Sequence, residues 1–175
     1  GAWANQSGPT RTVRAAAELG PKAEQLLKPL GKTANKVAEA VGAKAAAVDC
    51  PIPRPFLTHL RGPEDVRRIP GPLLPDLAAE IREKIDTVVS HTGGHLSSNL
   101  GSTELTIALH RVFDFSKDHL VFDVGHQAYP HKLLTGRAAQ FHTLRQEGGL
   151  SGYPDPKESR YDLFHTGHAG CAVSS

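Results

Sequence analysis

The chain has 175 residues, a formal net charge of +2 and a hydrophobic fraction of 39%, which suits about one folded domain and excludes a globally basic nucleic-acid-binding protein. No apolar run approaches the roughly 18 residues of a membrane-spanning helix, and no secretory signal opens the chain. The two cysteines form no CxxC pair, so no disulfide scaffold is expected, and the reducing cytoplasm is the expected compartment. Because the chain starts at Gly1 without methionine and stops just after a new element begins, we interpret it as a fragment.

The N-terminal third differs in composition from the rest. Residues 1–57 carry eight Lys and Arg against four Asp and Glu, whereas residues 58–175 carry twelve against fourteen and hold all ten histidines. Ala, Leu, Lys and Glu favour helix in residues 1–56, but Gly and Pro interrupt it and few large apolar side chains are present. We predict a disordered or weakly helical leader over residues 1–56. A basic arm that binds nucleic acid or acidic lipid is the alternative, and the spread of the charges does not favour it.

Seven prolines between residues 51 and 75 mark the start of the folded region, which we place at residue 57. Apolar residues then recur at spacings of three and four over residues 73–90, with charged residues between them, which predicts an amphipathic helix. Gly93-Gly94 ends it. A second helix is predicted over residues 102–113, with one face formed by Leu105, Leu109 and Val112.

A short buried strand is predicted next. Residues 120–124 (LVFDV) are mostly apolar, with an acid near the end, and residues 125–127 form the turn after them. Residues 133–144 are a weaker helix candidate around Gly136, and the glycines and prolines of residues 147–160 predict a loop. The order helix, strand, helix predicts α/β architecture.

Three histidines each follow a glycine in a predicted turn: Gly94-His95, Gly125-His126 and Gly167-His168. Glycine lets a ligand approach the backbone closely, and the turn after a strand is where open α/β sheets bind ligands. Histidine there moves protons near neutral pH or donates hydrogen bonds to phosphate. Any one of these histidines alone is better explained by a structural role, but three in the same setting favour one shared site.

Other kinds of site find little support. His91 and His95 have the spacing of a helical metal pair, but the glycines between them break the helix, so no metal site is assigned to this chain. The sequence contains no GxGxxG fingerprint, P-loop or GxSxG elbow, which leaves dinucleotide, nucleotide and serine-hydrolase sites without a motif. Four basic residues of the second half have two possible roles: Lys132, Arg137, Arg145 and Lys157. They either bind a phosphorylated substrate or lie on a solvent-exposed face, and the sequence does not decide between the two.

Several blocks of the sequence resemble one enzyme family. The blocks are residues 92–101 (TGGHLSSNLG), 104–110 (ELTIALH), 123–132 (DVGHQAYPHK), 134–137 (LTGR), 143–152 (TLRQEGGLSG), 158–162 (ESRYD) and 166–168 (TGH). From about residue 57 to residue 175 the chain resembles the 1-deoxy-D-xylulose-5-phosphate synthases, thiamine-diphosphate enzymes related to transketolase. Residues 1–56 resemble nothing in that family.

The resemblance implies a fold, a reaction and partners. The fold is the incomplete N-terminal part of a doubly wound, transketolase-like domain that binds thiamine diphosphate. The reaction condenses pyruvate with glyceraldehyde 3-phosphate, releases CO2 and forms 1-deoxy-D-xylulose 5-phosphate, a precursor of isoprenoids and thiamine. The family forms homodimers, with neither nucleic acid nor membrane as a partner. Its Mg²⁺ ligands are expected beyond Ser175, so we expect this chain alone to be inactive.

The resemblance also implies roles for individual residues. His95 is the expected catalytic residue, placed over the thiazolium ring to assist proton transfer. The expected cofactor-binding residues are Ser98, His126, Gly167, His168 and Ala169. Family members carry Ser or Thr after the last histidine, so one hydroxyl contact to the cofactor is expected to be missing at Ala169.

Three alternatives remain. Another transketolase-like carboligase is one, although the DVGHQ and GGLSG blocks disfavour it. The second is a non-catalytic binding or regulatory module derived from the same fold. The third is a nucleic-acid-binding protein that acts through residues 1–57, for which binding with a strong inverse salt dependence would be the sign.

Overall fold

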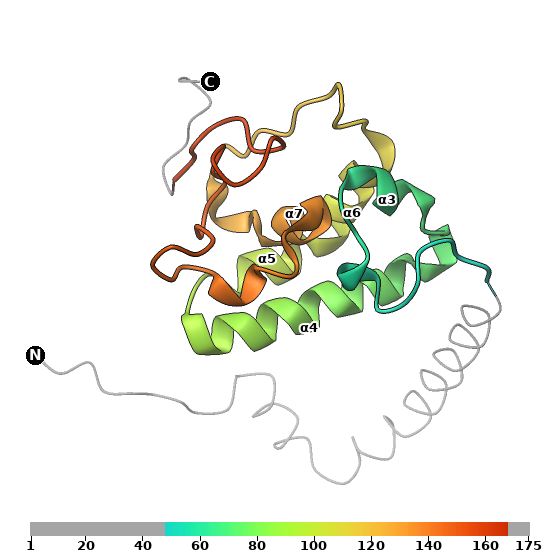
Figure 1. Ribbon diagram of the computed structural model, residues 1–175, viewed down its shortest axis with the longest axis horizontal. Coiled ribbons are helices and arrows are strands. Elements are labelled where there is room, and N and C mark those ends of the chain that lie inside the picture. Colours follow the sequence, from blue (N-terminus) through green and yellow to red (C-terminus); the bar gives the residue numbers. More distant parts are fainter. Residues whose placement is uncertain (1–47, 168–175) are drawn as a thin grey trace, which may run out of the picture. The chain divides into compact units, whose positions relative to one another are not determined.

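The computed structural model describes residues 48–167, which are the coloured part of Figure 1. The chain divides into two compact units, Gly1–Ala47 and Val48–Ser175, and the described residues all belong to the second. Residues 1–47, most of the predicted leader, lie outside the described residues, as do His168 and Ala169 of the predicted site. Across residues 48–167, no helix combines the length and the apolar character that crossing a lipid bilayer requires.

The described residues form helices joined by loops. The α-helices are α3 (Pro63–Arg68), α4 (Leu74–Thr92), α5 (Ser97–Gly101), α6 (Thr103–Val112) and α7 (Tyr129–Lys132). Short helical turns lie at η1 (Phe56–Thr58), η2 (Gly71–Leu73), η3 (Gly125–Gln127), η4 (Leu133–Arg137) and η5 (Phe141–Thr143). Figure 1 shows the long helix α4 with α5 and α6 packed along it and α7 next to α6.

The predicted helix over residues 73–90 is confirmed as α4. Its buried face is apolar and is made of Leu77, Ala78, Ile81, Ile85, Val88 and Val89. This spacing of three and four residues puts the six side chains on one stripe, which packs against α6. Gly93 has a φ of 71° and donates its backbone N–H to the Val89 carbonyl at 2.9 Å, which ends the helix. The turn that follows carries His95.

The predicted helix over residues 102–113 is confirmed as α6, but the face formed by Leu105, Leu109 and Val112 is not the buried one. Leu105 and Val112 are 63% and 76% exposed. The buried face consists of Thr103, Thr106, Ile107 and His110. The Thr103 and Thr106 hydroxyls donate to carbonyls one turn back, at 2.9 and 2.8 Å, so these polar groups are satisfied inside the fold. Apolar periodicity alone therefore does not identify the buried face.

The strand predicted over residues 120–124 is wrong, because these residues form a loop and no strand occurs anywhere in residues 48–167. A strand needs a neighbour that exchanges backbone hydrogen bonds with it, and no described segment pairs with this one. The α/β architecture is therefore not confirmed, and the described part of the chain is helical.

The helix predicted over residues 133–144 is wrong as one continuous element. It breaks at Gly136, whose φ is 87°, and is replaced by the short turns η4 and η5. A Cβ atom at this position would lie 2.5 Å from the Arg61 carbonyl oxygen, so the two backbones meet at a point that only glycine allows. The loop predicted over residues 147–160 is confirmed.

Residues 48–56, the described end of the predicted leader, pack on the helical body. Ile52 is 5% exposed, and Arg54 forms an ion pair with Asp76 of α4 at 2.5 Å. One turn further along α4, the Glu80 carboxylate accepts two backbone N–H groups of η1, both at 3.0 Å. Helix α4 thus fixes the path of the chain into the fold at two points, and the domain boundary at residue 57 stays a prediction.

Candidate active site

Two of the three glycine–histidine pairs lie side by side. His95 is in the turn between α4 and α5, and His126 is in η3. Their ring centroids are 5.1 Å apart, with 59° between the ring planes. The ring of Tyr153, from the loop after η5, lies 6.2 Å from the ring of His95. All three rings belong to partly exposed residues, so the two imidazoles meet close to the surface of the described residues.

Asn99 holds the two histidine segments together. Its side chain is fully buried, and its Nδ2 donates to the carbonyl oxygens of His95 at 2.6 Å and of His126 at 2.8 Å. Its Oδ1 accepts the backbone N–H of Tyr129 at 2.9 Å. Both amide donors and the acceptor are therefore used, and each bond ends on a different backbone segment of the site. Sequence reasoning missed this residue, although it lies inside the TGGHLSSNLG block, four positions after His95.

Glycine at position 94 allows the close approach of a buried tyrosine. Gly94 has a φ of 140°, and a Cβ atom there would lie 2.6 Å from the Tyr129 Oη. The backbone N–H of His95 donates to the same Oη at 3.4 Å. Burial raises the pKa of Tyr129, so the phenol stays protonated and neutral at physiological pH. The hydroxyl thereby fixes the backbone that carries the His95 ring.

Gly167, the glycine of the third predicted glycine–histidine pair, lies beside the turn that contains His126. The Gly125 backbone N–H donates to the Gly167 carbonyl oxygen at 2.9 Å. A Cβ atom on Gly125 would lie 2.7 Å from the Pro154 Cδ and 2.8 Å from the Thr166 carbonyl oxygen, so this junction requires glycine. The Thr166 Oγ1 is buried and has no hydrogen-bond partner among the described residues. The structure therefore brings Gly167 beside the His126 segment.

Ser98, the remaining predicted residue, lies in α5 and is partly buried, with its backbone carbonyl accepting the Ser102 N–H at 3.2 Å.

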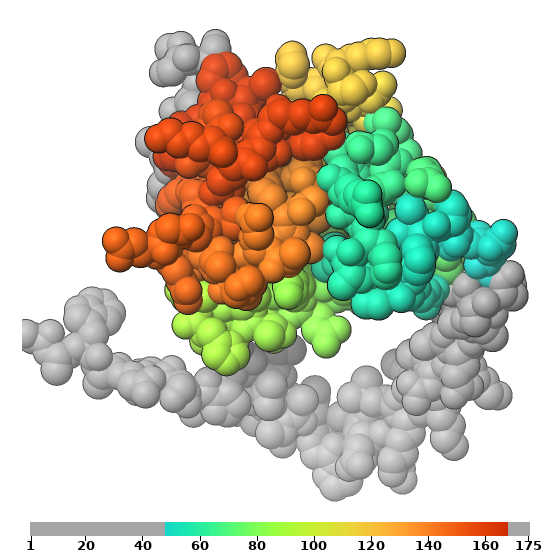
Figure 2. All heavy atoms as spheres, viewed as in Figure 1, coloured from blue at the N-terminus to red at the C-terminus, as the bar shows by residue number. Residues whose placement is uncertain are grey.

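A buried cluster of charged side chains joins α7 and η4 to the loop that ends at Gly167. Arg137 donates two hydrogen bonds to Asp162, at 2.6 and 3.0 Å, and His131 Nε2 lies 3.0 Å from the same carboxylate. Glu158 accepts from Lys132 and, at 3.2 Å, from Arg137. Figure 2 shows this loop, in orange to red, packed directly against the segment around α7. Lys132 and Arg137 are thus neither a solvated face nor a phosphate-binding pair, because internal carboxylates bind them both.

The cluster has a defined charge state. Burial alone would raise the pKa of Asp162, but hydrogen bonds from His131 and Arg137 outweigh it and hold that pKa well below its ordinary value. Burial, with the Arg137 charge nearby, lowers the pKa of Lys132. Burial and the adjacent His131 lower the pKa of His110 to about 3. Asp162 is therefore ionised and His110 is neutral near pH 7.

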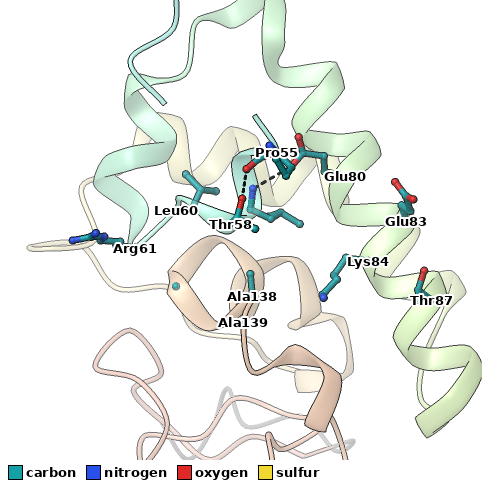
Figure 3. Close-up of a pocket in the computed structure, with 12 residues that line it drawn as sticks. Pro55, Thr58, Leu60, Arg61, Glu80, Glu83, Lys84, Thr87, Ala138 and Ala139 are labelled. Atoms are coloured by element: carbon teal, nitrogen blue, oxygen red, sulfur yellow. Dashed lines mark hydrogen bonds between the residues drawn. The ribbon is translucent and has the colours of Figure 1, made fainter. Parts of the chain in front are cut away.

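A separate hollow of about 610 Å³ lies between η1, α4 and η4, away from the histidines. Figure 3 shows that Glu83, Lys84 and Thr87 line it from α4, with Leu60 and Ala138 across from them. It contains none of the predicted site residues. Within residues 48–167, no group of three His, Cys, Asp or Glu side chains is arranged to hold a metal ion.

Comparison with known proteins places the chain in one family. Residues 57–175 match the family model described as 1-deoxy-D-xylulose-5-phosphate synthase. The protein of that name from Chromobacterium violaceum is 54% identical over 121 residues, which cover 69% of this chain and 20% of that protein. The protein of that name from Leptothrix cholodnii is 56% identical over 122 residues, covering 70% of this chain and 19% of that protein.

The chain thus spans about a fifth of the length of the curated relatives it matches. The matched range contains His95, His126 and Gly167, the three segments that meet in the structure. The chain belongs to the 1-deoxy-D-xylulose-5-phosphate synthase family.

Proposed function

We propose that this chain supplies one wall of the active site of an enzyme that condenses pyruvate with glyceraldehyde 3-phosphate, releasing CO2 and forming 1-deoxy-D-xylulose 5-phosphate. The observation that carries the proposal is the His95–His126 pair, with ring centroids 5.1 Å apart and both backbones bound by one buried asparagine. Preorganised imidazoles of this kind suit proton transfer at a bound ligand. Family membership names the reaction in which that transfer takes place.

The residues present fit thiamine diphosphate, the cofactor the family implies. Thr166 offers a buried hydroxyl with no partner among the described residues, next to the Gly125–Gly167 junction. Gly94 and Gly125 leave no room for a Cβ, so the backbone there is tightly packed and fixed in position. When bound, the cofactor supplies the electron sink for a two-carbon carbanion equivalent. His95 would take up and return protons beside it.

The other predicted residues would contact the cofactor. The His126 ring lies beside the His95 ring, and Gly167 is hydrogen-bonded to Gly125, the residue before His126. Ser98 precedes the asparagine that binds both histidine backbones. His168 and Ala169 follow Gly167 directly in the sequence and complete the proposed set. We expect the Mg²⁺ ligands for the diphosphate, the second subunit of a homodimer and the glutamate that activates the aminopyrimidine ring to come from outside these residues. The expected compartment is the cytoplasm.

A chimeric enzyme tests the proposal. Residues 57–175 replace the matching segment of the Chromobacterium violaceum relative, which gives a complete chain with 54% identity across the exchanged part. The chimera should form 1-deoxy-D-xylulose 5-phosphate from pyruvate and glyceraldehyde 3-phosphate when thiamine diphosphate and Mg²⁺ are supplied. His95→Ala should lower kcat by about 100-fold or more, the usual contribution of a positioned proton-transfer group.

His142→Ala is the matched control, because His142 is exposed and its Nδ1 lies 2.9 Å from the Ala139 carbonyl oxygen of its own turn. It should leave kcat within about two-fold of the parent, as surface substitutions away from a site usually do. Equal activity of His95→Ala and His142→Ala would refute the role of His95. Turnover of xylulose 5-phosphate in place of pyruvate would assign the chain to a different transketolase-like carboligase.

A further inference from the structure

The loop that ends at Gly167 reaches the candidate active site without a helix or strand to support it. Residues 144–167 contain turns and bends alone. At its end the loop is held at the site by the hydrogen bond from the Gly125 N–H to the Gly167 carbonyl at 2.9 Å. A second tie lies five residues earlier, where the Asp162 side chain is fully buried among groups of the helical body. Asp162 therefore ties the loop to the helical body five residues before Gly167.

The Asp162 carboxylate is saturated with donors. Arg137 donates to Oδ2 at 2.6 Å and to Oδ1 at 3.0 Å. His131 Nε2 lies 3.0 Å from Oδ1, and the Asp155 backbone N–H donates to Oδ2 at 2.9 Å. A carboxylate accepts about four hydrogen bonds, so every acceptor position is used. Donors from α7, η4 and the loop itself thus fix the position and the orientation of this one group.

The donors to Asp162 follow His126 closely in the chain. His131 belongs to α7 and Arg137 to η4, the two elements directly after the η3 turn that carries His126. Asp162, on the other side of the contact, directly precedes the stretch that carries Thr166 and Gly167. The Asp162 carboxylate therefore connects the segment that contains His126 to the loop that contains Gly167. Protein donors occupy both of its oxygens.

A second histidine supports this arrangement. The Nε2 of His110, in α6, lies 3.2 Å from Nδ1 of His131, and the His110 ring packs edge-on against Phe115 with centroids 4.7 Å apart. Burial lowers the pKa of both histidines, so both rings are neutral near pH 7. The Asp162 carboxylate and the Thr106 carbonyl can only accept, so His131 carries its proton on Nε2 and His110 carries its proton on Nδ1, and the bond to Asp162 fixes the tautomer and the orientation of His131.

We propose that Asp162, together with His131 as its donor, is a positioning residue that sets the spacing between the His126 and Gly167 segments and thereby the affinity of the site for thiamine diphosphate. The inference rests on the proposed function for the identity of the ligand. Asp162 touches no substrate or cofactor and acts through the loop it holds. Small displacements of a supporting shell are known to loosen a site that is otherwise intact.

The test measures binding of thiamine diphosphate with Mg²⁺ to the chimeric enzyme by equilibrium dialysis, without substrate. Asp162→Asn keeps the size of the side chain but loses its charge and two acceptor positions. It should raise the dissociation constant of the cofactor ten-fold or more, while kcat at saturating cofactor stays within about three-fold of the parent. Glu147→Gln is the control in the same loop, since it removes one carboxylate charge from an exposed side chain, and it should change the dissociation constant less than two-fold.

His131 gives an independent pair of variants. His131→Gln retains an amide donor for Asp162 and should bind the cofactor within about three-fold of the parent, whereas His131→Leu lacks the donor and should bind it ten-fold or more weaker. This pair also decides the question if Asp162→Asn does not fold. Failure of the parent chimera to bind the cofactor would refute the proposed function. A parent that binds, with Asp162→Asn or His131→Leu binding equally well, would overturn the positioning role alone.

Discussion

Removing the Asn99 amide should destabilise the chain more than any other single change at the candidate site. Leucine is close to asparagine in size but has no polar atom, so Asn99→Leu leaves the carbonyl oxygens of His95 and His126 and the N–H of Tyr129 without their present partner. Each buried polar group left unpaired costs about 1 to 3 kcal/mol. Because both histidines are partly exposed and water reaches some of these groups, we expect a total of about 3 to 5 kcal/mol.

Thermal unfolding of the 175-residue chain, followed by circular dichroism, measures this loss. For a domain of this size the expected decrease in Tm is roughly 10 °C or more. Asn99→Asp should also lower Tm, because a buried carboxylate still accepts the Tyr129 N–H but donates to neither carbonyl and is repelled by both of their oxygens. If Asn99→Leu is already unfolded at ambient temperature, the difference in Tm between Asn99→Asp and the parent measures the loss instead.

Gln140→Leu is the matched control, an exposed amide exchanged for the same apolar side chain. Its Tm should stay within about 2 °C of the parent, since exposed substitutions usually change stability by less than about 0.5 kcal/mol. The reasoning also predicts that nuclear Overhauser contacts between the His95 and His126 rings disappear in Asn99→Leu. A Tm equal to that of Gln140→Leu, with these ring contacts retained, would show that Asn99 does not hold the two segments together.

Three further outcomes are expected. The free energy of unfolding should fall by about 2 kcal/mol between pH 6.5 and 5. The reason is that the unfolded chain binds a proton at His110, whereas the folded chain, in which the pKa of His110 is about 3, does not. Calorimetry should show a smaller loss in His110→Gln, and an equal loss would contradict the assignment to His110. Gly125→Ala should weaken binding of thiamine diphosphate to the chimera ten-fold or more, because its Cβ would lie 2.7 Å from the Pro154 Cδ, whereas Gly101→Ala, which has open space around it, should bind normally. The 175-residue chain alone should release no CO2 from pyruvate above background, since the proposed function takes the Mg²⁺ ligands and the activating glutamate from outside these residues, and release at the rate of a complete enzyme would contradict this.

Local sequence patterns located the two longest helices of the described residues, α4 and α6, but predicted the packing of only the first. The spacing in residues 73–90 identifies α4 and its buried face, because a long amphipathic stripe has one way to bury itself. In α6 the same reasoning located the helix but not the buried face, since Thr103, Thr106 and His110 are satisfied by hydrogen bonds that the sequence does not display. The apolar residues 120–124 form no strand because strand formation depends on a partner segment, which local composition cannot supply.

The sequence pointed to the histidines of the candidate site but not to the residues that hold them in place. Glycine next to histidine at three places marked His95, His126 and Gly167, and the structure brings these three segments together. Asn99 and Asp162 were missed because each acts on backbone or side-chain groups far away in the chain, a relation that one sequence does not reveal. For the same reason the sequence left Arg137 and Lys132 open between a phosphate-binding role and a solvated face, although internal carboxylates bind both.

A crystal structure of the chimeric enzyme with thiamine diphosphate and Mg²⁺ tests the central claim most directly. The account predicts that the cofactor lies against His95 and His126, within hydrogen-bonding distance of at least one of the two rings, with Gly167 at its edge. A cofactor bound elsewhere on this segment, for example in the hollow between η1 and α4 (Figure 3), with His95 and His126 free of contact, would contradict it.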